Sequence, residues 1–360
     1  MLLAGCSGPS REELKSINYT PLPTQAFEVS TPADQGVDPL RIAELYYHAS
    51  KLKNIYSVLV LQNGKLIAEK YFNEGAVDQQ INIHSVTKSF TSALVGIALE
   101  QGELKSLDQK MMEFFPELAD KIKDPRKNDI TIRELLQMRA GFPWEESTPE
   151  LLNLLMTGFH TDTLVHVPLV RDPGSGFEYS NLSSHILGMI VARASGIDLK
   201  AYAQKHLFGP LGIEAGFWQT DWDGNILGFS DLHLTARDLA RFGQLYMNEG
   251  RYNGQQIVSA DWVRDSLQIY SRNGWKIRVG KNWGENAYGY QWWSIHAGNY
   301  RYNLAWGHGG EQIVLLKDLG MVIVVTGDPL HLQHGGGPWK KEKANLNLVA
   351  DFVASLPIAQ

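Results

Sequence analysis

The chain has 360 residues, 44% of them hydrophobic, which suffices for a large core in one big domain or in two interleaved lobes. Its net charge of −6 comes without a basic patch and argues against nucleic acid as a partner, and no apolar run reaches the roughly 18 residues of a membrane-spanning helix. The single cysteine excludes internal disulfides and any multi-cysteine zinc site.

The first 26 residues contain a pattern typical of exported proteins. Leu3-Ala4-Gly5-Cys6 resembles the lipobox at which bacterial lipoprotein signal peptides are cleaved and the cysteine is lipidated. The charged and apolar segments that precede a lipobox are missing, so either the chain begins inside a longer signal or the match is chance. We expect 1–26 to be a signal remnant and polar tether, and the protein to be lipid-anchored at Cys6 in the periplasm of the bacterial cell envelope. Without a genuine lipobox, a cytoplasmic location is expected.

Three elements are predicted before residue 84. Apolar residues at helical spacing predict a helix from residue 39 to about residue 53. Two strands, 56–62 and 65–72, flank Asn63-Gly64, which is the strongest short hairpin signal.

A helix buried nearly all round is predicted over 84–102, since apolar residues recur at helical spacing and small or apolar residues fill its other faces. Ser85 and Lys88 lie near its start and share a face, so the ammonium reaches the hydroxyl. A serine hydroxyl needs a neighbouring base to act as a nucleophile, and burial lowers the pKa of a lysine so that it can be that base. The helix start adds free N–H groups and partial positive charge where an oxyanion would form.

A serine three residues before a lysine also arises by chance. Ser50 and Lys53 form a second such pair at the polar end of the first helix, and we assign that pair to a solvated face. Other motifs must therefore decide whether Ser85 and Lys88 are catalytic.

The middle of the chain, from about 104 to 270, is predicted to be largely helical, with helices near 131–136, 183–194, 199–207 and 235–248. Three late strands are predicted, one from the alternation of Tyr288, Tyr290 and Trp292, and two from the apolar runs 312–316 and 321–326. An amphipathic helix over 341–355 follows.

Together these elements predict an α+β fold, in which an antiparallel sheet of about five strands is flanked by terminal helices and carries a large helical insertion. The sheet lobe would comprise 27–84 and 275–360, and the mainly helical lobe 85–274. A catalytic cleft is expected between the two lobes.

Two further motifs follow the serine-lysine pair. Asp172-Pro173-Gly174 leads to Tyr179-Ser180-Asn181 in a loop ahead of a helix. Gly307-His308-Gly309-Gly310-Glu311 lies before a strand, where small residues let a substrate approach the backbone closely.

Serine-lysine, tyrosine-x-asparagine and a basic residue followed by Gly-Gly, in this order, resemble the motifs of the penicillin-recognising serine hydrolases. The pattern looks most like the branch that holds class C β-lactamases, D-alanyl-D-alanine carboxypeptidases, lactamase-fold esterases and 6-aminohexanoate-dimer hydrolases. It covers most of the chain from about Phe27 and includes Pro210-Leu211-Gly212 and 235–242. The resemblance implies a β-lactamase/transpeptidase-like fold. No metal-ligand spacing, P-loop or dinucleotide fingerprint stands out, so neither a metal nor a cofactor is expected.

By this resemblance, Ser85 is the acylated nucleophile and Lys88 its partner in proton transfer. Tyr179 would share the proton relay and protonate the leaving group, which requires that nearby ammonium charge lower its pKa; a core tyrosine is the alternative. Asn181 would hydrogen-bond a substrate amide or carbonyl, or would merely cap a helix. The backbone N–H groups of Ser85 and Glu311 would form the oxyanion hole.

At His308 the chain departs from the lactamase pattern, which usually has lysine. Histidine is mostly neutral near pH 7 and holds a substrate carboxylate less firmly. This favours esters or amides without an obligatory carboxylate over β-lactams and D-alanyl-D-alanine peptides. The expected substrate-binding residues are Asn181, His308, Gly309 and Gly310, and a purely structural role for the histidine is the alternative.

Other residues allow two interpretations. Glu145 and Glu146 could line the rim of the cleft as acid or base, although exposed loop carboxylates are the commoner case. Four tryptophans could shape an apolar pocket or pack in the core: Trp283, Trp292, Trp293 and Trp306.

The sequence therefore predicts a serine hydrolase that cleaves a small ester or amide through an acyl-enzyme on Ser85. The alternative is a non-catalytic envelope lipoprotein that binds peptidoglycan or a protein partner. A buried lysine argues against this alternative, because a pure binding protein need not keep so costly a group. The expected partners are a small-molecule substrate and, through Cys6 alone, a membrane; the sequence does not determine the oligomeric state.

Overall fold

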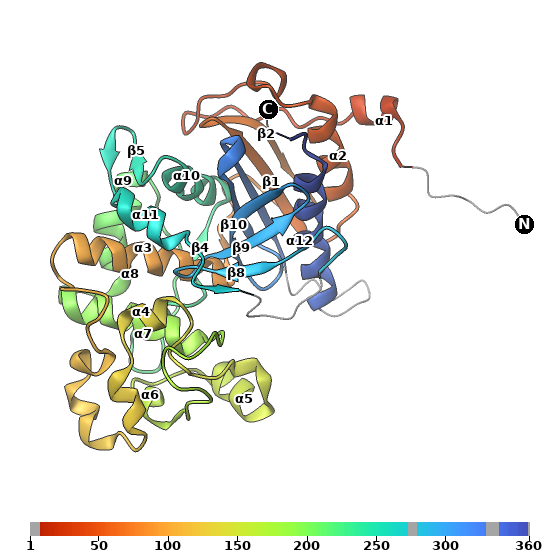
Figure 1. Ribbon diagram of the computed structural model, residues 1–360. Coiled ribbons are helices and arrows are strands. Elements are labelled where there is room, and N and C mark those ends of the chain that lie inside the picture. Colours follow the sequence, from red (N-terminus) through yellow and green to blue (C-terminus); the bar gives the residue numbers. More distant parts are fainter. Residues whose placement is uncertain (1–7, 273–278, 329–337, 359–360) are drawn as a thin grey trace, which may run out of the picture.

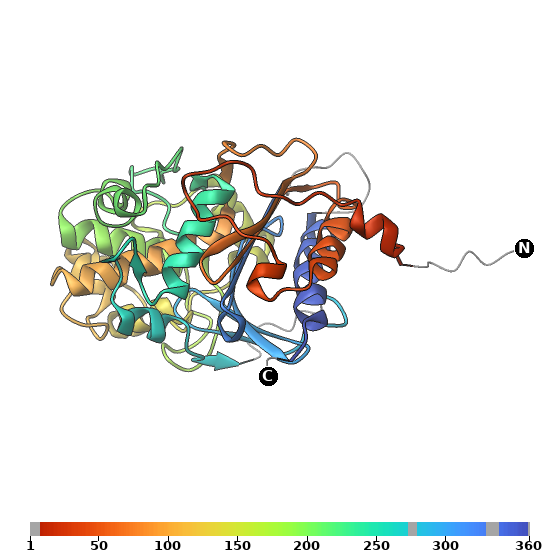
Figure 2. The same cartoon turned by 90° about the horizontal axis from the view of Figure 1, so that it is seen from above.

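A computed structural model of the chain describes residues 8–272, 279–328 and 338–358. An antiparallel sheet lies in the middle of the molecule, with helices α2 (Pro39–Ala49) and α12 (Pro338–Ser355) on one face and the larger helical part on the other (Figures 1 and 2). Cys6, the predicted lipidation site, lies outside the described residues. Within the described ranges, no helix is both long enough and apolar enough to cross a membrane.

The central sheet has eight strands in the order β2-β1-β12-β11-β10-β9-β8-β7. Its strands are β1 (Ile55–Gln62), β2 (Lys65–Tyr71), β7 (Ser271–Arg272), β8 (Asn286–Tyr288), β9 (Trp293–Ala297), β10 (Tyr300–Trp306), β11 (Gln312–Leu316) and β12 (Met321–Gly327). Two short antiparallel pairs lie outside it: β3 (Ile81–Asn82) with β4 (His233–Leu234), and β5 (Arg251–Tyr252) with β6 (Gln255–Gln256). Early and late strands meet where β1 pairs with β12, so the predicted α+β fold with one antiparallel sheet is confirmed.

The remaining helices belong mainly to the larger helical part. They are α1 (Arg11–Lys15), α3 (Thr87–Glu100), α4 (Ile132–Leu136), α5 (Pro149–Thr157), α6 (Thr163–His166), α7 (Asn181–Ser195), α8 (Leu199–Ala203), α9 (Gly209–Leu211), α10 (Ala236–Met247) and α11 (Ala260–Ser266). The helix predicted over 199–207 is α8 followed by a π-helical turn, Gln204–Phe208. The other predicted helices are confirmed to within a few residues.

Side chains alternate between the two faces of the sheet and so build two apolar cores. Leu59 of β1 and Ile313 of β11 face the larger helical part. Their neighbours Val58 and Val314 face the other way and pack with Leu346 of α12. The N-terminal hairpin follows from its turn, because Asn63 and Gly64 have positive φ angles of 50° and 81°, as a two-residue hairpin turn of this hand requires.

The sheet has more strands than the five or so predicted. The strand expected over 288–292 is wrong, because β8 ends at Tyr288 and Gln291 has a φ of 61°. The Gln291 side chain donates to the carbonyl oxygens of Leu135 and Leu136 and fastens this turn to the helical part. The hairpin of β9 and β10 was missed, although alternate residues of both strands are apolar.

Part of the segment predicted as a tether contacts the sheet lobe, within the residues described from 8 onward. α1 has a complete capping box formed by Ser10 and Glu13. The carbonyl of Tyr19 accepts the N–H of Glu69 on β2, and its ring lies 5.7 Å from that of Tyr46.

The helix that follows Ser85, α3, is buried over nearly its whole length, as predicted. A side chain on Gly96 would meet the ring of Trp262, since a Cβ built there lies 2.4 Å from ring atoms. The absence of a side chain at this position therefore lets α11 pack directly on α3 and holds the nucleophile-bearing helix in place.

We expect Gly96→Ala to lower the free energy of unfolding by about 1–3 kcal/mol, the usual effect of overpacking. This loss should occur although alanine favours a helix by about 1 kcal/mol over glycine. In a Trp262→Leu background the same substitution should cost nothing or stabilise. Urea unfolding of the four proteins measures this, and an equal loss in both backgrounds would contradict the packing argument.

Candidate active site

Ser85 lies in the single turn, His84–Val86, that leads into α3. The preceding His84 has a φ of 46°, an unfavourable conformation for a residue with a side chain. Its backbone N–H donates to Oδ1 of Asn82 over 2.8 Å. The turn is held in this form and leaves Ser85 half-buried at the open end of the helix.

The amine of Lys88 lies against Ser85, as the sequence predicted. Its Nζ is 2.7 Å from Ser85 Oγ, 2.8 Å from Asn181 Oδ1 and 3.1 Å from the carbonyl oxygen of Phe229. The side chain is 2% exposed, and this burial lowers the pKa of Lys88 to about 7, although the charges of Glu145 and Glu146 oppose the shift. The amine is thus close to half neutral at pH 7, next to a hydroxyl.

Tyr179 also reaches Ser85, and a hydrogen bond joins the two side chains. The tyrosine ring stacks on Trp293 at 5.7 Å and lies 5.0 Å from Lys88 Nζ. The expectation that ammonium charge lowers the pKa of Tyr179 is wrong. Burial raises this pKa far more than the hydrogen bond from Ser85 lowers it, so Tyr179 is a neutral phenol at ordinary pH.

Glu145 fixes the start of α7, which carries Asn181. The carboxylate is 1% exposed and accepts three hydrogen bonds of 2.8 Å, from Ser180 Oγ and from the N–H groups of Asn181 and Leu182. Burial raises the pKa of Glu145, and these hydrogen bonds oppose the shift. It is therefore neither an exposed loop carboxylate nor part of the rim, unlike its neighbour Glu146.

Close packing of backbones positions the carbonyl oxygen of Phe229, the third hydrogen-bond partner of the Lys88 amine. A Cβ on Gly228 would lie 2.5 Å from the carbonyl oxygen of Ser184, and one on Gly188 would lie 3.1 Å from the Cα of Gly228. Thr91 of α3 donates to the carbonyl of Gly228 over 2.8 Å. The segment before Phe229 therefore fits between α3 and α7, a placement that the sequence did not reveal.

His308 follows β10, close to the Ser85 turn. Its Nδ1 lies 2.9 Å from Oε2 of Glu342, and the other carboxylate oxygen of Glu342 accepts Trp306 Nε1 over 2.7 Å. The hydrogen bond to Glu342 raises the pKa of His308, so the imidazole keeps its charge to higher pH than an ordinary histidine. The expectation of an ordinary, mostly neutral histidine did not allow for this shift, because no feature of the sequence indicated a buried carboxylate from α12.

Gly307 and His308 line the cavities beside Ser85, but Gly309, Gly310 and Glu311 do not. Residues 307–310 form a tight turn, in which the N–H of Gly310 donates to the carbonyl of Gly307 over 3.0 Å. Gly310 faces α12, where an added Cβ would meet Asn345, and the side chain of Glu311 is fully buried. Gly309 and Gly310 therefore do not border either cavity, and their contact with substrate stays a prediction.

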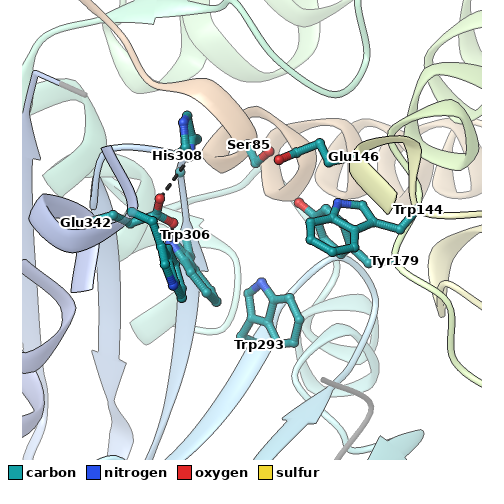
Figure 3. A pocket seen from close by; sticks show the side chains of 10 residues that line it. Ser85, Trp144, Glu146, Tyr179, Trp293, Trp306, His308 and Glu342 are labelled. Atoms are coloured by element: carbon teal, nitrogen blue, oxygen red, sulfur yellow. Dashed lines mark hydrogen bonds and ion pairs between the residues drawn. The ribbon is translucent and has the colours of Figure 1, made fainter. Parts of the chain in front are cut away.

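Two cavities meet at Ser85, Glu146 and His308. The first, which we call the aromatic cavity, measures about 290 Å³, and Figure 3 shows rings on several sides of it. Its other lining residues are Trp144, Tyr179, Trp293, Trp306, Gly307, Trp339 and Glu342. The second, the α5 cavity, measures about 710 Å³ and is lined by His84, Asn181, Phe229, Asp231 and residues of α5 and of the 219–222 segment, among others.

The four tryptophans singled out in the sequence have different positions. Trp293 and Trp306 line the aromatic cavity, and Trp283 packs edge-on behind Trp306 at 5.9 Å. Trp292 is fully buried in the core. Within the described residues, no group of three or more His, Cys, Asp or Glu side chains is placed to hold a metal ion.

Comparison with known proteins gives consistent results. A family model described as Beta-lactamase matches residues 56–342. The 6-aminohexanoate-dimer hydrolase of Paenarthrobacter ureafaciens is 27% identical over 307 residues, which is 79% of this chain and 76% of that protein. The solved octameric penicillin-binding protein homologue from Pyrococcus abyssi has a TM-score of 0.64 at 21% identity, over 86% of this chain and 76% of its own. EstCE1, a hydrolase with promiscuous acyltransferase activity, has a TM-score of 0.68 at 16% identity, over 88% of this chain and 98% of its own.

We expect Glu145→Ala to lower the free energy of unfolding by about 3 kcal/mol or more, because it leaves three buried donors at the start of α7 without an acceptor. The neighbouring Glu146→Ala is the matched control and should change stability by less than about 0.5 kcal/mol. Urea unfolding measures both. Equal stabilities of the two variants would show that the buried carboxylate does not hold the helix.

Proposed function

Because this chain belongs to the beta-lactamase family, whose model matches residues 56–342, we propose that it is a serine hydrolase that cleaves a small ester or amide through an acyl-enzyme on Ser85. The observation that carries the proposal is the distance of 2.7 Å between Lys88 Nζ and Ser85 Oγ, combined with a lysine pKa lowered to about 7. A neutral amine at this distance can take the hydroxyl proton as the oxygen attacks a carbonyl.

The surroundings of Lys88 suit this exchange. In its neutral form the amine offers its lone pair to the proton of Ser85. Once protonated, it remains hydrogen-bonded to two neutral acceptors, Asn181 Oδ1 and the carbonyl oxygen of Phe229. These acceptors orient the amine without adding a full negative charge that would keep it permanently protonated.

We propose that Tyr179 donates the proton that the leaving group needs. Since its pKa is raised, the phenol holds its proton and can donate it when the carbon–oxygen or carbon–nitrogen bond breaks. Protonated Lys88, 5.0 Å from the centre of the ring, then returns a proton to the phenolate through water, since the acylated Ser85 oxygen has no proton to relay. Water attacks the acyl-enzyme in the second half of the reaction by the same steps in reverse.

The N–H of Ser85 is our first oxyanion donor, because the start of a helix leaves its N–H groups without intrahelical partners. The N–H of Glu311 as second donor remains a proposal. Asn181 is 4% exposed and bound to Lys88, and we propose that it positions the amine in addition to its predicted contact with substrate.

The substrate class follows from the charges around Ser85. The positive charge of His308 is offset by Glu342, and Glu146 lines the same cavity. Among the described residues that line this cavity, the one cationic side chain is therefore already paired with a carboxylate, which favours esters or amides without an obligatory carboxylate. A location in the bacterial cell envelope, anchored through Cys6, is also a proposal.

A non-catalytic binding protein is the alternative, and the buried amine argues against it. Placing Lys88 in the interior costs stability, which a binding function would not require.

A fluorophosphonate probe should add one covalent adduct per chain to the wild type, detected by intact-mass measurement. Ser85→Ala should remain unlabelled while keeping its folded circular dichroism. Ser50→Ala, which alters the other serine-x-x-lysine match, is the control and should be labelled like the wild type. An adduct on Ser85→Ala would place the nucleophile elsewhere.

The kcat/KM for hydrolysis of p-nitrophenyl acetate should increase as the pH rises through about 7, because the base is the neutral form of Lys88. The pKa of the His308 imidazole is raised from its ordinary value by Glu342, so His308→Gln is the control for a histidine titration and should keep the rising limb. In Lys88→Arg the guanidinium cannot lose its proton in this pH range, and kcat/KM should fall at least about 10²-fold. A flat profile between pH 6 and 8.5, or full activity of Lys88→Arg, would remove the lysine from the mechanism.

A further inference from the structure

We propose that the aromatic cavity binds the cationic group of the substrate, an ammonium or quaternary ammonium no larger than a trimethylammonium. This inference narrows the substrate class of the proposed function. It depends on that function in one respect, namely that the bound cation is part of the substrate. It comes from the rings and carboxylates that surround the cavity, of which only Tyr179 takes part in the proton-transfer steps.

The rings form a continuous wall. Tyr179 stacks on Trp293 at 5.7 Å, Trp293 lies 5.5 Å from Trp306, and Trp306 stacks on Trp339 at 6.2 Å. Trp144 stands beside Tyr179 on the side of the cavity opposite Trp306 (Figure 3). Ring faces on several sides of one small space attract a cation through their quadrupoles, and this arrangement is the one that recognises quaternary ammonium groups.

The charged groups that line the cavity indicate whether its ligand is a cation or an uncharged apolar group. Among the described residues, three titratable side chains other than Tyr179 line the cavity: Glu146, Glu342 and His308. Two carboxylates and one imidazolium leave a net charge of −1, which becomes −2 when His308 loses its proton. Glu342 is engaged by His308 and Trp306, so the attraction for a ligand cation falls chiefly to Glu146, whose carboxylate points toward Ser85 (Figure 3).

In the described part of the chain, two lysines lie over rings of this wall without lining the cavity. Lys88 lies 5.0 Å from the centre of the Tyr179 ring, and Lys343 lies 4.9 Å from that of Trp339. Neither lysine is among the residues that line the cavity.

The size of the cavity limits the ligand group. Its volume of about 290 Å³ is just below the range of about 300–1,000 Å³ typical of ligand pockets. It accommodates one substituent of the substrate, while the rest extends into the α5 cavity on the other side of Ser85.

The test compares choline with 3,3-dimethylbutanol, its neutral isostere, by intrinsic tryptophan fluorescence and calorimetry on the full chain. Both probes are also measured on Ser85→Ala, so that binding is read without turnover. We expect choline to bind at least about tenfold more tightly than the isostere, on the scale of a desolvated cation–π contact. Equal affinity of the two probes would indicate a merely apolar pocket and overturn the proposal, as would the absence of binding by both.

Two substitutions separate the charge from the shape of the cavity. Glu146→Gln should weaken the binding of choline at least about threefold and leave the affinity for the isostere unchanged. Glu150→Gln, on the exposed face of α5, is the matched control and should change neither affinity. Choline affinity unaffected by Glu146→Gln would overturn the role of this carboxylate. A preference for choline without labelling of Ser85 by the fluorophosphonate would leave this inference standing and overturn the proposed function instead.

Discussion

The burial of one amine is the constraint on which the site depends. Lys88 carries a basic group into the interior of the helical part, where a charge is costly, and meets neutral hydrogen-bond acceptors there. The cost is reduced by lowering the pKa of the amine to about 7 rather than by pairing it with a carboxylate. A charged partner in contact would hold the proton on the amine, and the lysine could then not serve as a base for Ser85.

The rest of the fold keeps those acceptors in place. Glu145 holds the first turn of α7 and with it Asn181, and the glycine contacts between α7 and the 228–229 segment place the carbonyl of Phe229. The sheet contributes the opposite wall, where the end of β10 comes so close that an added Cβ on Gly307 would lie 2.6 Å from the carbonyl oxygen of Ile83. Elements far apart in the sequence thus converge on one half-buried hydroxyl.

Local signals in the sequence were enough for much of this arrangement. The spacing of Ser85 and Lys88 on one face of a buried helix predicted their contact, and Asn63-Gly64 predicted the hairpin at the edge of the sheet. The electrostatics could not be read in the same way, since the pKa of Tyr179 depends on how deeply its ring is enclosed and that of His308 on Glu342, 34 residues further along the chain. The structural roles of Glu145 and Gly228 were missed for the same reason, because each depends on which distant backbone it meets.

The mechanism requires the amine of Lys88 to be close to half neutral at pH 7 beside Ser85. An NMR titration of protein labelled at lysine ¹³Cε measures this, with the Lys88 resonance assigned by its absence in Lys88→Arg. We expect a titration midpoint near 7. A midpoint near 10.5, the ordinary value for a lysine, would contradict it.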